Sequence, residues 1–124
     1  MKALSIRQPW ASMIVYGFKP VENRSWRSHY RGPLLIHAGK KYDHEGENWI
    51  INNLDCSPEM LARIKQSQDL RGGIIGSVNM VDCVSYHESP WYAGDCAFVF
   101  TDPKPMDFRA CRGKLNFFDV PEDN

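Results

Sequence analysis

The stretch LSIRQPWAS at residues 4–12, followed by GFKPVENRSW at residues 17–26, decides how this chain folds. Pro9 is suited to the first position of a helix, where its missing N–H costs nothing, and Gly17 is suited to ending that helix. The apolar runs on either side of this helix are short and have the composition of β-strands. The stretch therefore predicts a helix over residues 9–16 between two strands.

Outward from this stretch, alternating apolar runs and capping residues predict the remaining elements. Ser57 is a capping residue that precedes Pro58, which indicates the start of a helix. Gly76, inside a long apolar strand, indicates a bulge or a tight bend. The expected strands cover residues 3–6, 21–26, 34–38, 73–84, 97–101 and 115–120, and the expected helices cover residues 9–16, 43–53 and 58–68. Short strands mixed with two or three helices predict an α+β fold with a small curled sheet.

The bulk composition predicts one domain over residues 1–124. The chain has 124 residues, of which 43% are hydrophobic and 12% aromatic, enough to form one core. No run approaches the roughly 18 apolar residues of a membrane span, and the N-terminus does not resemble a signal peptide. We therefore expect a cytoplasmic protein that does not bind membranes.

The four cysteines do not predict a metal site. Cys56, Cys83, Cys96 and Cys111 are widely spaced, whereas zinc fingers and ribbons take their ligands in close pairs. Without an export signal a disulfide framework is not expected either. We expect reduced, mostly buried thiols, no metal and no cofactor.

Charge is distributed unevenly along a chain whose net charge is zero. Residues 1–41 carry eight Lys or Arg and one acid, Glu22, and the rest of the chain carries seven bases and fourteen acids. This asymmetry indicates a side that faces a polyanion, although a solvated basic surface would give the same pattern. Net neutrality argues against sequence-blind duplex binding, which requires many phosphates to be neutralised.

These motifs together resemble those of the ASCH (activating signal cointegrator homology) family. The resemblance is carried by LSIRQPWAS at 4–12, GxKxxExRSW at 17–26, RG at 31–32, IxAxKK at 36–41 and GIIGSVNMVDC at 73–83. It covers nearly the whole chain and constrains residues 42–70 least. The family implies a PUA-like small β-barrel with a cleft beside the first helix, and its general expectation is nucleic-acid binding. We therefore expect RNA or another single-stranded nucleic acid as partner, because RNA is usually recognised through unstacked bases.

Four residues of the second motif are the main site candidates. Lys19 could pair with a phosphate or, if desolvated, act as a base, although an ordinary surface lysine is the alternative. Glu22, Arg24 and Trp26 alternate along a strand and so share one face. Glu22 could accept a hydrogen bond from a base amine, and Trp26 offers a flat stacking surface. An ion pair between Glu22 and Arg24 that only braces the barrel mouth is the structural alternative.

The wider set of predicted nucleic-acid-binding residues is Ser5, Arg7, Gln8, Lys19, Glu22, Arg24, Trp26, Lys40 and Ser77. Ser77 and Asn79 share a strand face and are expected to line the same cleft from its other side. Trp10 is expected in the core, since it begins the apolar face of the first helix. His37 lies within an apolar strand and is interpreted as a hydrogen-bonded barrel histidine rather than a catalytic one.

Two other functions remain open from the sequence. Small bacterial members of the family are amidohydrolases acting on N4-acetylcytidine, and some members have been assigned ribonuclease activity, so Lys19 and Glu22 would be catalytic if this chain is an enzyme. Those amidohydrolases resemble GxKxxT, with a glutamate on a later strand, but here Glu22 replaces the threonine and Ser77 and Asn79 offer no acid. The third reading is a protein-interaction module that uses an exposed Trp91 and Tyr92.

Overall fold

The computed structural model describes residues 1–121. Within that range the elements run in the order β1 (Lys2–Gln8), α1 (Trp10–Val15), β2 (Val21–Arg24), β3 (Gly32–Tyr42), α2 (His44–Asn53), α3 (Pro58–Ser67), β4 (Gly73–Val84), β5 (Cys96–Ala110) and β6 (Phe117–Asp119). Every expected helix and strand is present, which agrees with the predicted α+β class. The differences lie in the length of the strands, above all of β5.

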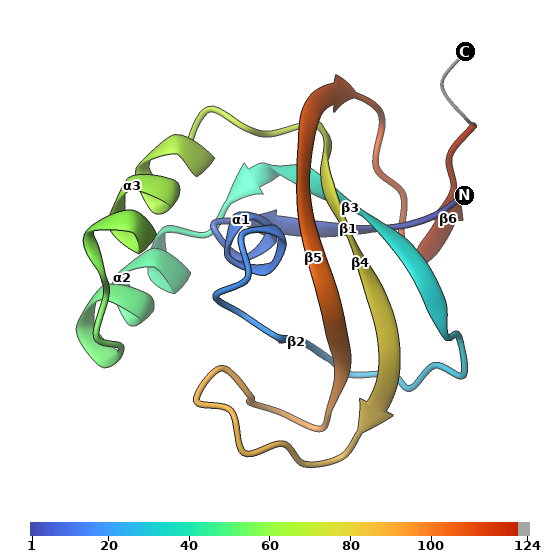
Figure 1. Ribbon diagram of the computed structural model, residues 1–124, viewed down its shortest axis with the longest axis horizontal. Coiled ribbons are helices and arrows are strands. Elements are labelled where there is room, and N and C mark those ends of the chain that lie inside the picture. Colours follow the sequence, from blue (N-terminus) through green and yellow to red (C-terminus); the bar gives the residue numbers. More distant parts are fainter. Residues whose placement is uncertain (122–124) are drawn as a thin grey trace.

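All six strands form one strongly curved sheet with the order β2-β5-β4-β3-β1-β6 (Figure 1). Only β1 and β3 pair in parallel, and every other pair is antiparallel. Among residues 1–121 no ladder joins β2 to β6, so the sheet is open rather than a hydrogen-bonded barrel. Side chains bridge the gap instead, because Arg24 Nη2 donates to the Ser5 carbonyl at 3.0 Å and Trp26 meets Phe117 at 5.5 Å between ring centroids. The fold is therefore barrel-like, with one side closed by side chains.

Helix α1 sits inside the curve of the sheet and fills the barrel. Ala11, Ile14 and Val15 pack into the main core with apolar side chains of the strands. A Cβ atom at Gly76 would lie 2.8 Å from the Val15 side chain and 2.5 Å from a β5 carbonyl, so only glycine lets helix and sheet approach here. The ladders on both sides of Gly76 shift register, which confirms the predicted bulge.

Helices α2 and α3 lie side by side at one end of the molecule, coloured green in Figure 1. Asp43 caps α2 by accepting from the Gly46 amide at 2.9 Å, and Ser57 caps α3 by accepting from the Met60 amide at 3.1 Å. Their buried faces form a second core with α1 and β2, made of Met13, Val21, Ile50, Met60, Ile64, Trp91 and Ala97. The two helices thus pack beside the barrel, against α1 and β2.

Strand β5 runs to Ala110, nine residues beyond the predicted end at residue 101. Beyond Phe100, whose amide donates to the Pro20 carbonyl at 2.9 Å, β5 pairs only with β4 among residues 1–121, so its other edge is free there. Pro103 and Pro105 are tolerated because proline lacks an N–H and a free edge does not require one. The prolines in the sequence predicted that the strand ends before them. In the structure β5 continues through both prolines because it pairs with the long strand β4.

Candidate functional site

A cavity of about 590 Å³ opens where α1, β1, β2, α2 and the β4–β5 loop meet. Its lining consists of Ser5, Ile6, Arg7, Trp10, Lys19, Glu22, Asn23, Arg24, Ser25, Trp26, Trp49, Trp91 and Ala93. All four tryptophans of the chain are in this set. A concave site of this size is typical of a small-ligand pocket, and here its lining combines aromatic side chains with charged and polar ones.

Three of the tryptophans form a cluster at one end of the cavity. The ring centroids of Trp10, Trp49 and Trp91 are 6.3 to 6.4 Å apart, with the planes tilted or edge-on to one another. Trp91 is only 7% exposed and forms the base of the cluster, while Trp49 is 41% exposed and stands at the rim. The cluster therefore presents aromatic surface to solvent through Trp49 and the half-buried Trp10.

Trp10 is held in place by the start of α2. Its indole Nε1 donates to Asp43 Oδ2 at 2.9 Å, and a Cβ atom at Gly46 would lie 2.5 Å from the Trp10 ring. Burial would raise the pKa of Asp43, but the hydrogen bonds from Trp10 and the Gly46 amide outweigh it and leave the pKa below its usual value. The N-cap of α2 is thus also the anchor of the aromatic wall.

The β4–β5 loop, orange in Figure 1, brings Trp91 to the cavity by docking on β2. Asn23 Nδ2 donates to the Trp91 carbonyl at 2.9 Å, and the Ala93 amide donates back to Asn23 Oδ1 at 2.9 Å. One amide side chain in β2 therefore fixes a loop that lies about 70 residues further along the chain.

A network of three charged side chains forms the polar wall of the cavity. Glu22 lies between two cations, with Lys19 Nζ at 3.2 Å from Oε1 and Arg24 Nη2 at 3.1 Å from Oε2. The Lys19 side chain is 2% exposed and also donates to the Val21 carbonyl. Two cations and one carboxylate give this wall a net positive charge, and Lys19 Nζ lies 5.5 Å from the Trp10 ring centroid.

Burial lowers the pKa of Lys19 below its ordinary value, and it does so against the opposing influence of Glu22. The nearby Arg24 guanidinium lowers the pKa further. Arg24 carries a second unusual feature, since its Nε is buried and has no hydrogen-bond partner within residues 1–121. The cavity wall therefore contains a lysine whose pKa is lowered by burial and an arginine whose buried Nε has no partner among the described residues.

The structure brings six of the nine predicted binding residues to this cavity. The six are Ser5, Arg7, Lys19, Glu22, Arg24 and Trp26. Trp26 lines it with one side only, because its ring also packs edge-on against Phe98 at 5.1 Å. Trp10 was expected in the core and does contact both core clusters, but it is half-buried and also lines the cavity.

Gln8, Lys40 and Ser77 are not part of the cavity lining. Gln8 is fully buried, where its amide nitrogen donates to Ser12 Oγ at 2.8 Å and to the Leu70 carbonyl at 2.9 Å. This corrects the expectation that Gln8 reaches the cleft, since its side chain instead ties α1 to the segment before β4. Lys40 lines a different hollow.

The expectation that Ser77 and Asn79 face the cleft is also corrected. Both lie in the middle of β4, between β3 and β5, and neither lines the cavity. His37 is buried and hydrogen-bonded on both ring nitrogens, in agreement with its structural interpretation. Trp91 was predicted as exposed in the protein-interaction reading, and its burial against the other tryptophans contradicts that part of the reading.

Sequence reasoning did not identify Trp49. It lies in α2, inside residues 42–70, where the motif resemblance is weakest. The helix is mostly polar, and its two buried residues are Gly46 and the neighbouring Ile50. A tryptophan beside the apolar face of a polar helix is the one signal that could have indicated a ligand-facing role.

Among residues 1–121 no three His, Cys, Asp or Glu side chains are grouped so as to hold a metal ion. No helix in that range is long and apolar enough to cross a membrane.

Comparison with known sequences gives one family and two curated relatives. The ASCH domain profile matches residues 4–98. Activating signal cointegrator 1 of Homo sapiens is 36% identical over 113 residues, and that of Mus musculus is 32% identical over 113 residues. Each match covers 84% of this chain but 19% of the relative, so the chain spans about a fifth of the length of these proteins.

Solved structures with the same fold come from Zymomonas mobilis. Its ASCH protein has a TM-score of 0.57 at 13% identity, covering 98% of this chain and 87% of that chain. A mutant of that protein has a TM-score of 0.56 at 14% identity, covering 98% and 88%. These likenesses confirm the α+β fold and carry no statement about ligands.

Proposed function

The chain belongs to the ASCH domain family, a family generally related to nucleic-acid binding, and we propose that it is a single-strand nucleic-acid-binding module, with RNA the favoured ligand. The observation that carries the proposal is the convergence of all four tryptophans and a net positive ion network on one cavity. Aromatic faces bind bases of any sequence by stacking, and cations bind the phosphates between them.

In this proposal an unstacked base enters the cavity and stacks on the exposed tryptophans. Trp49 at the rim and Trp10 beside it provide the aromatic surface. Arg24 and Arg7 also line the cavity, and the Arg7 side chain is 61% exposed, so its charge is available to a phosphate. Bases inside a duplex are stacked and paired, so they could not enter a hollow of this kind without being extruded.

The test is a titration that uses the site as its own reporter. Because every tryptophan lines the cavity, intrinsic fluorescence should change as single-stranded RNA is added to the wild-type protein. Trp49→Ala should weaken the affinity by about 1–3 kcal/mol, the usual value of one base–aromatic contact, or roughly 5- to 150-fold. The affinity should also fall as salt rises, with a modest slope that reflects few phosphate contacts.

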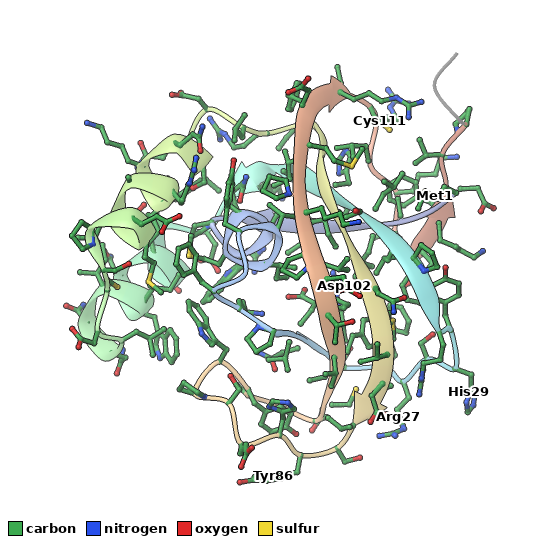
Figure 2. The ribbon with its side chains drawn as sticks, viewed as in Figure 1. Met1, Arg27, His29, Tyr86, Asp102 and Cys111 are labelled. Carbon is green, nitrogen blue, oxygen red and sulfur yellow. The ribbon has the colours of Figure 1, made fainter. Side chains whose placement is uncertain are left out.

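The matched control is Tyr86→Ala, which removes an aromatic ring outside the cavity. Tyr86 is 75% exposed on the β4–β5 loop and is labelled at the foot of Figure 2. This variant should bind as the wild type does. Absence of any binding at low salt by the folded wild type, or an equal loss in both variants, would overturn the proposal.

A second candidate function, hydrolysis of an N4-acylated cytidine by Lys19 and Glu22, has one observation in its favour. The lowered pKa of Lys19 increases the neutral amine that a general base needs. Ser77 and Asn79 lie outside the cavity, so they offer no nucleophile or acid there. We expect no cytidine from N4-acetylcytidine and no cleavage of RNA. Chromatographic detection of cytidine that depends on Glu22 would establish the hydrolase instead.

A further inference from the structure

A second hollow of about 810 Å³ lies on the opposite side of Ser5 from the tryptophan cavity. It is formed by β1, β3, Gly72 just before β4, the end of β5 and the loop that follows β5, and Cys111 of that loop is labelled in Figure 2. Ser5 lines both hollows. Its carbonyl accepts from Arg24 on the tryptophan side, and its hydroxyl bonds His37 on the other side.

The floor of this second hollow is rigidly built. His37 Nε2 lies 2.6 Å from the Cys111 carbonyl, which can only accept, so Nε2 carries the proton. His37 Nδ1 then accepts from the Ser5 hydroxyl at 2.9 Å when the ring is neutral. A Cβ atom at Gly113 would lie 2.7 Å from the His37 ring, so glycine is needed for the loop to lie flat on it. One buried histidine thus pins the loop against the sheet.

The side chains around that floor are basic. Lys40, Arg112 and Lys114 line the hollow, and among residues 1–121 no acidic residue lines it. Within residues 1–121 none of these three cations forms an ion pair, whereas Lys2, Arg7, Lys19, Arg24 and Arg31 all do. Gly39, Gly72 and Gly113 are also in the lining, and their lack of side chains leaves room for a bulky group to approach the backbone.

We propose that this hollow, defined by Lys40, Arg112 and Lys114, binds the phosphate backbone of the same strand whose base occupies the tryptophan cavity. The inference rests on the proposed function and adds the path of the strand, which passes over Ser5 from one hollow to the other. Lysine and arginine side chains that have no ion-pair partner within residues 1–121, around an open floor that includes glycines, suit phosphates, which bind without sequence preference.

The test compares two double variants of exposed lysines. Lys40→Glu/Lys114→Glu reverses charge in the second hollow, and Lys65→Glu/Lys104→Glu makes the same change on α3 and β5, outside both hollows. The first pair should weaken single-stranded RNA binding at low salt by at least about tenfold. Its slope of log affinity against log salt should be shallower by about 1.4, or 0.7 for each lost phosphate contact. The control pair should change both quantities much less.

The outcomes separate this inference from the proposed function. If the wild type binds, Trp49→Ala weakens binding and both lysine pairs behave alike, the phosphate path is wrong while the binding function stands. If the wild type binds no single-stranded nucleic acid, both the binding function and the phosphate path are wrong. Potassium phosphate and potassium chloride at equal ionic strength should weaken RNA binding by the wild type to the same extent. Stronger inhibition by phosphate that disappears in Lys40→Glu/Lys114→Glu would identify a site for free phosphate and overturn the shared-strand path.

Discussion

Replacing Glu22 by glutamine should destabilise the fold strongly, because this carboxylate is the one acid among the described cavity-lining residues. It accepts from Lys19 at 3.2 Å and pairs with Arg24 at 3.1 Å. The Lys19 side chain is 2% exposed, so water cannot replace the lost partner. Removing one member of a buried ion pair costs about 3–5 kcal/mol, and we expect about 3 kcal/mol because Lys19 keeps its bond to the Val21 carbonyl.

The loss should depend on pH in a definite direction. Burial already lowers the pKa of Lys19 and Glu22 opposes that shift, so the pKa should fall further in the variant. Between this lowered pKa and the ordinary value of 10.5 the unfolded chain binds a proton that the folded chain has released. The free energy of unfolding therefore rises with pH through that window, and the window begins at a lower pH in Glu22→Gln than in the wild type.

Urea unfolding followed by tryptophan fluorescence, at neutral pH and again at mildly alkaline pH, measures both effects. With a slope of about 2 kcal/mol per molar urea, a loss of about 3 kcal/mol lowers the midpoint by about 1.5 M. Asp119→Asn is the matched control, since its 3.7 Å pair with Lys2 is 80% exposed at the aspartate and should contribute little. Equal midpoints for the two variants, or a loss in Glu22→Gln that does not shrink at alkaline pH, would refute the reasoning.

Three further predictions concern residues outside the charged network. Gln8→Ala should lower the free energy of unfolding by about 1–3 kcal/mol, because the buried Ser12 amide loses its acceptor and the Leu70 carbonyl loses its donor, and an unchanged thermal midpoint would contradict the assignment. Ser57→Ala should cost about 1 kcal/mol through the lost cap of α3 and leave RNA affinity unchanged, as circular dichroism melts and titrations would measure. Burial and the hydrogen bond to Glu47 raise the pKa of Tyr42 to about 12, so phenolate absorbance should show one tyrosine ionising near that pH. Glu47→Gln should lower this pKa, and the stability that Tyr42 contributes below pH 10 should be lost as the pH rises toward 12.

The local elements follow from short-range chemistry and were predictable on that basis. Ser57 and Pro58 mark the first turn of α3, and Gly17, at a φ of +84°, ends the helical segment as expected. The strand over residues 73–84 was predicted with the bounds that β4 has, including the bulge at Gly76. Such features depend only on a residue and its near neighbours in the chain, so they can be predicted from the sequence.

Part of the candidate site could be predicted from the sequence for the same reason. Lys19, Glu22 and Arg24 lie within six positions of one another, and the alternation of a strand places the last two on one face. Their contact is a local consequence of α1 ending and β2 beginning. The direction of the Lys19 pKa shift required the structure, because burial is its largest cause and the depth of burial depends on the tertiary packing.

By itself, the sequence determined the family, the α+β class, most of the elements and the short-range network of Lys19, Glu22 and Arg24. Only the tertiary structure decided that Trp49 and Trp91, 42 residues apart, join Trp10 in one aromatic wall. It also decided that the Gln8 side chain is buried and hydrogen-bonded inside the protein, while its neighbour Arg7 lines the cavity. The physical reason is that burial and convergence come from contacts between distant segments, and no local pattern of residues records which segments will meet.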